Sequence, residues 1–104
     1  MTKLTTEQLM KALEDLGLED KIILRNYDFE TAVIGTDVLT GRVIYDYGKM
    51  VEYLVEKEGW EHIDAMDWID YNTLRALPYM GENAPIIMDN ISEFLKDYEV
   101  EENE

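Results

Sequence analysis

The clearest β-sheet signal in this 104-residue chain is ETAVIGTDVLTGRVIYD, residues 30–46. Its two ends, residues 30–36 and 42–46, are rich in β-branched side chains, which favour extended backbone. The segment between them, DVLTG (37–41), has the composition of a turn, so we predict a β-hairpin. A third short strand is expected at residues 86–88, which read Ile-Ile-Met and would return to pair with the hairpin.

Helical patterns flank the hairpin on both sides. Thr5 and Gln8 have the spacing of a capping box, and Asp46 stands where a helix cap is expected. With the apolar periodicity, these signals predict four helices: residues 6–16, 47–57, 62–73, and a last one from Asn90 to about Tyr98. Residues 21–25, Lys-Ile-Ile-Leu-Arg, fit either a short strand or a buried turn.

These elements predict an α+β fold. We expect one small domain, residues 1–98, in which a three-stranded, mainly antiparallel sheet (the hairpin plus one short strand) packs with three to four helices. About a hundred residues is one domain's length of chain. The final residues, 99–104, carry acids without a base and are expected to form a frayed tail.

The charge of the chain excludes several kinds of partner. There are 24 Asp and Glu against 9 Lys and Arg, a formal net charge of −15. Nucleic acids and anionic lipids would be repelled, because both are bound chiefly through Lys and Arg, so we expect no direct nucleic-acid or membrane partner. No apolar run approaches the roughly 18 residues that a membrane span requires. With no Cys in the chain, these features favour a cytoplasmic protein.

Catalytic patterns are weak. The only Ser, Ser92, and the only His, His62, are thirty residues apart, and Ser92 has the position of a helix start. The six glycines are isolated, so none forms a phosphate-binding loop. With 24 acids, some carboxylate pair lies close in any fold, so proximity carries no information. We therefore expect no enzyme, no catalytic residues and no cofactor.

A metal site is a weaker alternative. Glu61, Asp64, Asp67 and Asp70 follow one another at three-residue spacing on a predicted helix, and His62 is adjacent. Cations such as Ca²⁺ need a loop that folds several oxygens around them, and the sequence contains no EF-hand pattern. We expect no metal ligands, and His62 is predicted to be an exposed residue of a first helical turn.

The strongest functional signal is acidic. Between residues 52 and 70 the chain has seven acids and a single base, Lys57. A three-residue step advances about 4.5 Å along a helix, so such a row can imitate DNA phosphates to a Lys- and Arg-lined groove. Trp60 and Tyr71 are the candidate anchors beside it. The predicted contact residues are Glu52, Glu56, Glu58, Trp60, Glu61, Asp64, Asp67, Asp70 and Tyr71.

Arg75 is a lone base among apolar residues, and it must find a partner for its charge. We expect it to pair with Asp70 or Asp28 and so to pin the third helix to the sheet.

Three segments carry a resemblance to other proteins: YDFETA (27–32), GRVIY (41–45) and, most specifically, WIDYNTLRALPY (68–79). Over roughly residues 27–88 the chain resembles a group of uncharacterised small acidic proteins encoded in Firmicutes genomes, phages and mobile elements. The group supplies no catalytic residues. The resemblance implies that the gene lies among phage or prophage genes. Such genes commonly encode small acidic inhibitors of host defence, including anti-CRISPR and anti-restriction proteins.

The charge and the resemblance together lead to one hypothesis and one alternative. The hypothesis is a non-enzymatic, DNA-mimic-like inhibitor that binds a basic nucleic-acid-binding host protein. The alternative is a small cytosolic interaction or regulatory module whose charge serves solubility only, since a charged helix face is usually just solvated. An apolar edge strand also permits self-association, so we expect a monomer or a homodimer.

Overall fold

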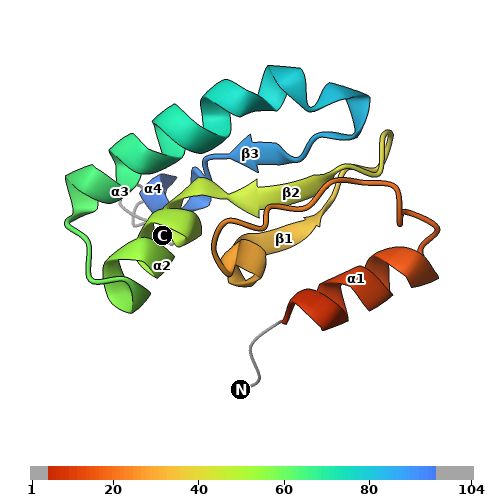
Figure 1. Cartoon of the computed structure of the whole chain (residues 1–104), viewed down its shortest axis with the longest axis horizontal. Coiled ribbons are helices and arrows are strands. Elements are labelled where there is room, and N and C mark those ends of the chain that lie inside the picture. The colour runs from red at the N-terminus through yellow and green to blue at the C-terminus, as the bar shows by residue number, and fades with distance from the viewer. Residues whose placement is uncertain (1–4, 96–104) are drawn as a thin grey trace, which may run out of the picture.

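The computed structural model describes residues 5–95 and places three short strands in one sheet (Figure 1). The strands are β1 (Val33–Thr36), β2 (Val43–Asp46) and β3 (Ile86–Met88), in the order β1-β2-β3. β1 and β2 are antiparallel, as the hairpin prediction requires, whereas β2 and β3 are parallel. The predicted α+β fold is therefore confirmed, but the expectation of a mainly antiparallel sheet is wrong, because the sheet is mixed.

The parallel pairing follows from the connection between β2 and β3. Residues 47–85 are mostly helical and carry the chain back along the sheet before β3 begins (Figure 1). A parallel neighbour requires a crossover of this kind, whereas an antiparallel neighbour can follow a short turn. Ile44 then lies opposite Ile86, and Asp46 opposite Met88.

The hairpin is shorter than predicted at its start. Residues 30–32 belong to a 3₁₀ helix, Phe29–Ala32, because Phe29 and Ala32 both turn fully into the core. At the other end the turn is tight: Gly41 adopts a φ of +76°, and a Cβ there would lie 2.6 Å from the Leu18 side chain. The positive φ favours a glycine at that position, and the Leu18 side chain would have to move to make room for a Cβ.

Two helices begin where the sequence predicts. In α1 (Thr6–Asp15) the hydroxyl of Thr5 accepts from the Gln8 N–H at 3.1 Å, and the Gln8 side chain accepts from the Thr5 N–H at 3.0 Å, which completes the predicted capping box. In α2 (Tyr47–Lys57) the Asp46 carboxylate accepts from the Lys49 N–H at 3.1 Å. The cap at Asp46 is thus confirmed as well.

The third helix changes its winding along its length. The predicted helix at residues 62–73 consists of α3 (His62–Trp68) and a π-helical segment, Ile69–Thr73, and a 3₁₀ segment, Leu74–Tyr79, follows without a break. We call residues 62–79 the helical arm. A single-turn helix, α4 (Ser92–Leu95), follows β3, and the rest of the helix expected there, with the tail at 99–104, lies outside the described residues.

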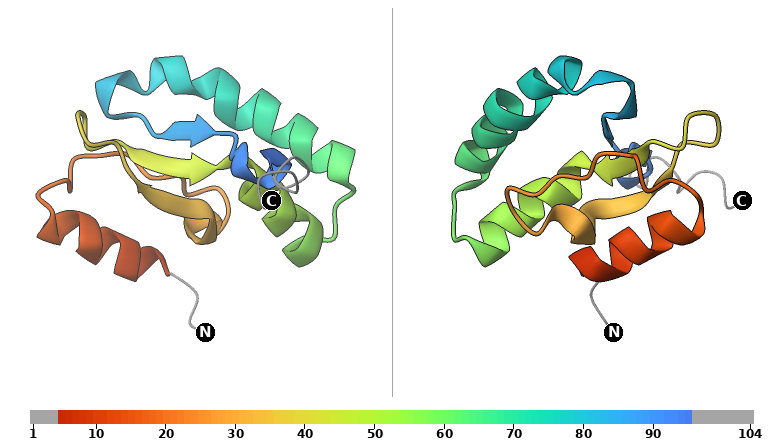
Figure 2. Two further views of the ribbon diagram at one scale, coloured as in Figure 1. Left: turned by 180° about the vertical axis from the view of Figure 1, so that it is seen from behind. Right: turned by 45° about the vertical axis from the view of Figure 1, so that its right-hand side comes forward.

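The core lies between the sheet and the elements that cover it. The arm runs along one side of the sheet, and α1 lies on the other side of the hairpin (Figures 1 and 2). Residues 21–25 form no strand; instead the Leu24 N–H donates to the buried Tyr45 hydroxyl at 2.9 Å. The largest fully buried side chains are Tyr45, Phe29, Met50, Leu54, Ile69, Val43 and Pro85. Among residues 5–95, none of the helices has the length and apolar composition of a membrane-spanning segment.

Candidate protein-interaction site

Five of the nine predicted contact residues meet in one shallow groove on the outer side of α3. The groove, called here the α3 groove, contains both candidate anchors together with three of the acids. It is lined by Gly59, Trp60, Glu61, Asp64, Asp67, Trp68, Tyr71 and Asn72.

Local backbone geometry gathers these residues. Gly59, with a φ of +75°, ends α2 and lets the Trp60 N–H donate to the Leu54 carbonyl at 3.2 Å. The arm starts directly afterwards, with Glu61 at its N-cap position. Asp64, Asp67, Trp68 and Tyr71 then follow at helical spacing and share one face. The opposite face, which includes Ala65 and Ile69, is buried: both of these residues have no exposed surface.

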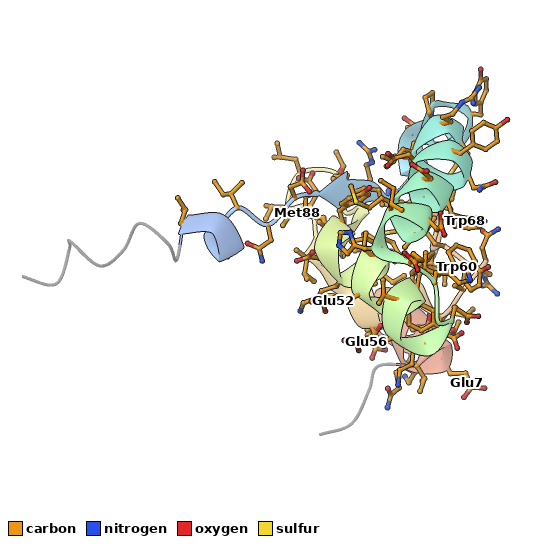
Figure 3. The ribbon with its side chains drawn as sticks, turned by 90° about the vertical axis from the view of Figure 1, so that its left-hand side faces the viewer. Glu7, Glu52, Glu56, Trp60, Trp68 and Met88 are labelled. Carbon is orange, nitrogen blue, oxygen red and sulfur yellow. The ribbon has the colours of Figure 1, made fainter. Side chains whose placement is uncertain are left out.

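The wall of the groove is aromatic. The Trp60 and Trp68 rings are both half-buried, and their centroids are 6.2 Å apart at an interplanar angle of 66° (Figure 3). Tyr27 packs edge-on against both, at 5.8 Å from Trp60 and 5.1 Å from Trp68. Such contacts hold the rings in fixed orientations. Trp60 and Trp68 thus both line the groove while they also pack against the core.

Tyr71 lies at the far end of the groove, and Arg75 lies beside it, outside the groove lining. Tyr71 is 67% exposed, and the guanidinium carbon of Arg75 lies 4.6 Å from the centroid of its ring. The expected ion pair of Arg75 with Asp70 or Asp28 is wrong, because in residues 5–95 its guanidinium forms no ion pair and lies instead over the ring. Tyr71 and Arg75 are four residues apart, a spacing that brings two side chains together on a helix. Asp67, Asp70, Tyr71 and Arg75 together line a small hollow beside the groove.

Asp70 is engaged inside the molecule. Its carboxylate accepts a hydrogen bond of 3.0 Å from the hydroxyl of Tyr47, the first residue of α2. Partial burial, and after it this hydrogen bond, raises the pKa of Tyr47 from 10.0 to about 12. Asp70 therefore fixes the arm to the start of α2 and offers less of its charge to a partner than its neighbours do.

The remaining predicted acids lie elsewhere. Glu52 and Glu56 are exposed along α2, on the other side of the two helices from Trp60 and Trp68 (Figure 3). Glu58 borders a second hollow, at the N-terminal end of α1, which also contains Lys57. The seven acids between residues 52 and 70 thus occupy several surfaces, and only the set Glu61, Asp64 and Asp67 lines the aromatic groove.

The electrostatics of the α3 groove follow from its lining. Three carboxylates are present and no Lys or Arg side chain is among the lining residues. Carboxylates beside low-dielectric aromatic walls focus a negative potential into the hollow. In residues 5–95, no group of three or more His, Asp or Glu side chains is placed to hold a metal ion. His62 is exposed in the first turn of α3, as predicted.

Three of the groove residues, Gly59, Trp68 and Asn72, are not among the predicted contact residues. A helical spacing from Asp64 and Tyr71 would have found Trp68, which is four residues after the one and three before the other. Asn72 donates to the Trp68 carbonyl at 3.0 Å, a contact within the helix that no sequence pattern marks.

Relatives do not assign a role to this groove. No protein-family model, curated protein or solved structure matches the chain. The groove is an open hollow with aromatic walls and three carboxylates on its border.

Proposed function

We propose that this chain is a non-enzymatic accessory protein of phage or prophage type that binds and blocks a basic nucleic-acid-binding host protein, such as a CRISPR or restriction effector. The α3 groove is the contact surface in this proposal. The observation that carries it is the meeting of Trp60 and Tyr71 with three carboxylates in a hollow that no Lys or Arg side chain lines.

The carboxylates supply the recognition of a basic surface. Glu61, Asp64 and Asp67 are exposed and follow the helix at three-residue steps, each about 4.5 Å along the axis. A protein that holds phosphates in a Lys- and Arg-lined channel meets a comparable row of negative charges here. The net charge of −15 adds long-range attraction, which speeds the encounter and weakens as salt is added.

The aromatic side chains supply the short-range contact. Exposed carboxylates alone contribute little to affinity, because water and salt screen them. Trp and Tyr side chains in a hollow are typical anchors of protein interfaces, because they bury a large area and lose little rotamer freedom. In the α3 groove the contacts with Tyr27 already hold Trp60 and Trp68 in place.

A specific observation favours the alternative, an interaction module whose charge serves solubility only. At the tip of the hairpin, Val38 and Leu39 are 97% and 93% exposed. Two aliphatic side chains in water at a tight turn are suited to insertion into an apolar pocket of a partner. In that reading the partner contacts the tip, and added salt has little effect on binding.

Charge reversal tests the proposal. The probe is fluorescent DNA bound to a purified CRISPR effector or restriction enzyme, and the measurement is the displacement of the DNA by this chain, followed by anisotropy. The groove variant Glu61→Lys, Asp64→Lys, Asp67→Lys is expected to displace DNA about tenfold less well or worse, because it loses three ionic contacts and introduces repulsion.

A matched control separates the groove from the total charge. The variant Glu14→Lys, Glu19→Lys, Glu82→Lys changes the net charge equally at exposed acids outside the α3 groove, and it should displace DNA nearly as well as the wild type. Equal displacement by the groove variant and the wild type would overturn the proposal. Loss of binding in Val38→Ser, Leu39→Ser instead, with no dependence on salt, would establish the alternative.

A further inference from the structure

We infer that the Tyr71 end of the α3 groove is a site for an arginine side chain of the partner, and that Arg75 occupies this site in the free protein. The inference rests on the proposed function, which it extends by naming the side chain that is recognised and an internal competitor for it.

The position of Arg75 supports this assignment. Its guanidinium carbon is 4.6 Å from the centroid of the Tyr71 ring, within the range of a cation–π contact. In the described residues it makes no ion pair, although Asp67 and Asp70 line the same hollow. The chain's own structure thus shows that this ring, beside two carboxylates, accepts a guanidinium group.

The chemistry of the hollow favours arginine over lysine. A planar guanidinium can stack on a ring with one face and still donate hydrogen bonds from its edge to carboxylates in the same plane. A lysine ammonium is compact and strongly hydrated, so it gives up more water to reach the same ring. The ring of Tyr71 offers the stacking face, and the carboxylates of Asp67 and Asp70 line the same hollow and form no ion pair with Arg75 in the described residues.

The helical arm holds these groups together. The π-helical segment Ile69–Thr73 carries Asp70 and Tyr71, and Arg75 follows immediately in the 3₁₀ segment. π-helical turns are rare and are found frequently at functional sites. The hydrogen bond from the Tyr47 hydroxyl to Asp70 fixes this part of the arm to α2. The Asp70 side of the hollow is therefore anchored, while Arg75 is exposed.

Arg75 consequently competes with the incoming side chain. A partner arginine that stacks on the covered face of Tyr71 must first displace Arg75, and the displaced contact is one of the exposed cation–π type. Removing Arg75 should therefore improve the binding of an arginine-rich partner by about two- to fivefold.

The experiment compares two peptides of equal charge, fluorescent nona-arginine and nona-lysine, and measures the affinity of each by anisotropy at one fixed low salt concentration. The wild type is expected to prefer nona-arginine. Tyr71→Leu should lose most of this preference while still binding nona-lysine, and Tyr71→Phe, which keeps the ring, should retain it. Circular dichroism and thermal unfolding of each variant show that it is folded.

Arg75→Gln is the decisive variant. The loss of a positive charge strengthens the binding of both peptides. The uncovering of the Tyr71 ring, in contrast, raises the ratio of nona-arginine affinity to nona-lysine affinity. Arg25→Gln removes the same charge from an exposed residue outside the groove and is the control. A rise in the ratio for Arg75→Gln alone supports the inference. Equal ratios in Arg75→Gln, Arg25→Gln and the wild type would overturn the competitor role.

The outcomes also separate this inference from the proposed function. If Tyr71→Leu leaves the peptide preference unchanged while the Glu61, Asp64 and Asp67 reversal abolishes binding, the arginine site is wrong and the acidic contact surface stands. If the Glu61, Asp64 and Asp67 reversal binds both peptides as tightly as the wild type does, the acidic contact surface is wrong and the proposed function fails.

Discussion

The α3 groove and the tip of the β1–β2 hairpin both expose apolar side chains, but they do so in opposite ways. In the groove, Trp60 and Trp68 are half-buried and have three carboxylates around them. At the tip, Val38 and Leu39 are almost wholly exposed, and the only acid of the turn, Asp37, is bound within it. Exposed apolar surface specifies a kind of partner only where charge accompanies it, and in this molecule the groove has both.

The largest expected effect is on the groove's own structure. Trp68→Ala removes a ring that contacts Trp60, Tyr27 and Phe29, and it should lower the free energy of unfolding by about 2–3 kcal/mol in urea titrations. Tyr79→Ala, at a residue that is 90% exposed on the same arm, is the matched control and should change it by less than about 0.5 kcal/mol. Similar values for the two variants would show that the aromatic wall is not a packed unit.

A smaller effect is expected where the arm joins α2. Tyr47→Phe removes the hydrogen bond to Asp70, which is exposed, so the loss of stability at neutral pH should be only about 0.5 kcal/mol. Folding raises the pKa of Tyr47 from 10.0 to about 12, so its contribution is complete below pH 10 and is lost as the pH rises toward 12. Thermal unfolding of both proteins across this range should show the wild type losing its advantage, and a constant difference would contradict the role of the hydroxyl proton.

At the hairpin tip, the expected effect on stability depends on pH. Hydrogen bonds from the Thr40 hydroxyl and N–H lower the pKa of Asp37 below its ordinary value of 3.8. A carboxyl of this kind stabilises the fold above its ordinary pKa, and the contribution is lost as the pH falls through the lowered value. Asp37→Asn should therefore melt slightly below the wild type at pH 7 and together with it in strong acid. A gap that persists in acid would assign the effect to packing.

The smallest expected effect is on the two exposed side chains of the tip. Val38→Ser, Leu39→Ser should leave the free energy of unfolding unchanged within about 0.5 kcal/mol, because neither side chain is buried. It should also leave DNA displacement unchanged if the groove is the contact surface. A stable variant that no longer binds would reverse the comparison and make the tip the functional region.

Local signals predicted much of this fold correctly. The capping box of Thr5 and Gln8, the cap at Asp46 and the turn before Gly41 each depend on residues close together in the sequence, and each is present. The direction of β3 depends on how residues 47–85 cross the sheet, which no local pattern encodes. The 3₁₀ helix at Phe29–Ala32 replaces predicted strand because burial of Phe29 outweighs the β preference of its neighbours.

The candidate site could also be predicted in part from the sequence. Helical spacing brought Asp64, Asp67 and Tyr71 to one face, as the sequence indicates. Helical spacing could not show that Glu52 and Glu56 lie on a different surface from these residues. The angle between α2 and α3 is set by packing around the aromatic rings. Arg75 lies over Tyr71, four residues before it on the helical arm, rather than pairing with Asp70 of the same arm or with Asp28.

The crossover between β2 and β3 has a consequence for dynamics. The arm that bears the groove is also the connection that closes the sheet, and β3 pairs with β2 over a short parallel stretch at Ile44, Tyr45 and Asp46. A partner that restrains the arm therefore also restrains β3, since an edge strand leaves its neighbour only if the chain before it can move. Binding of a partner in the α3 groove should therefore slow the hydrogen exchange of the backbone amides of Ile86–Met88, which lie outside the groove.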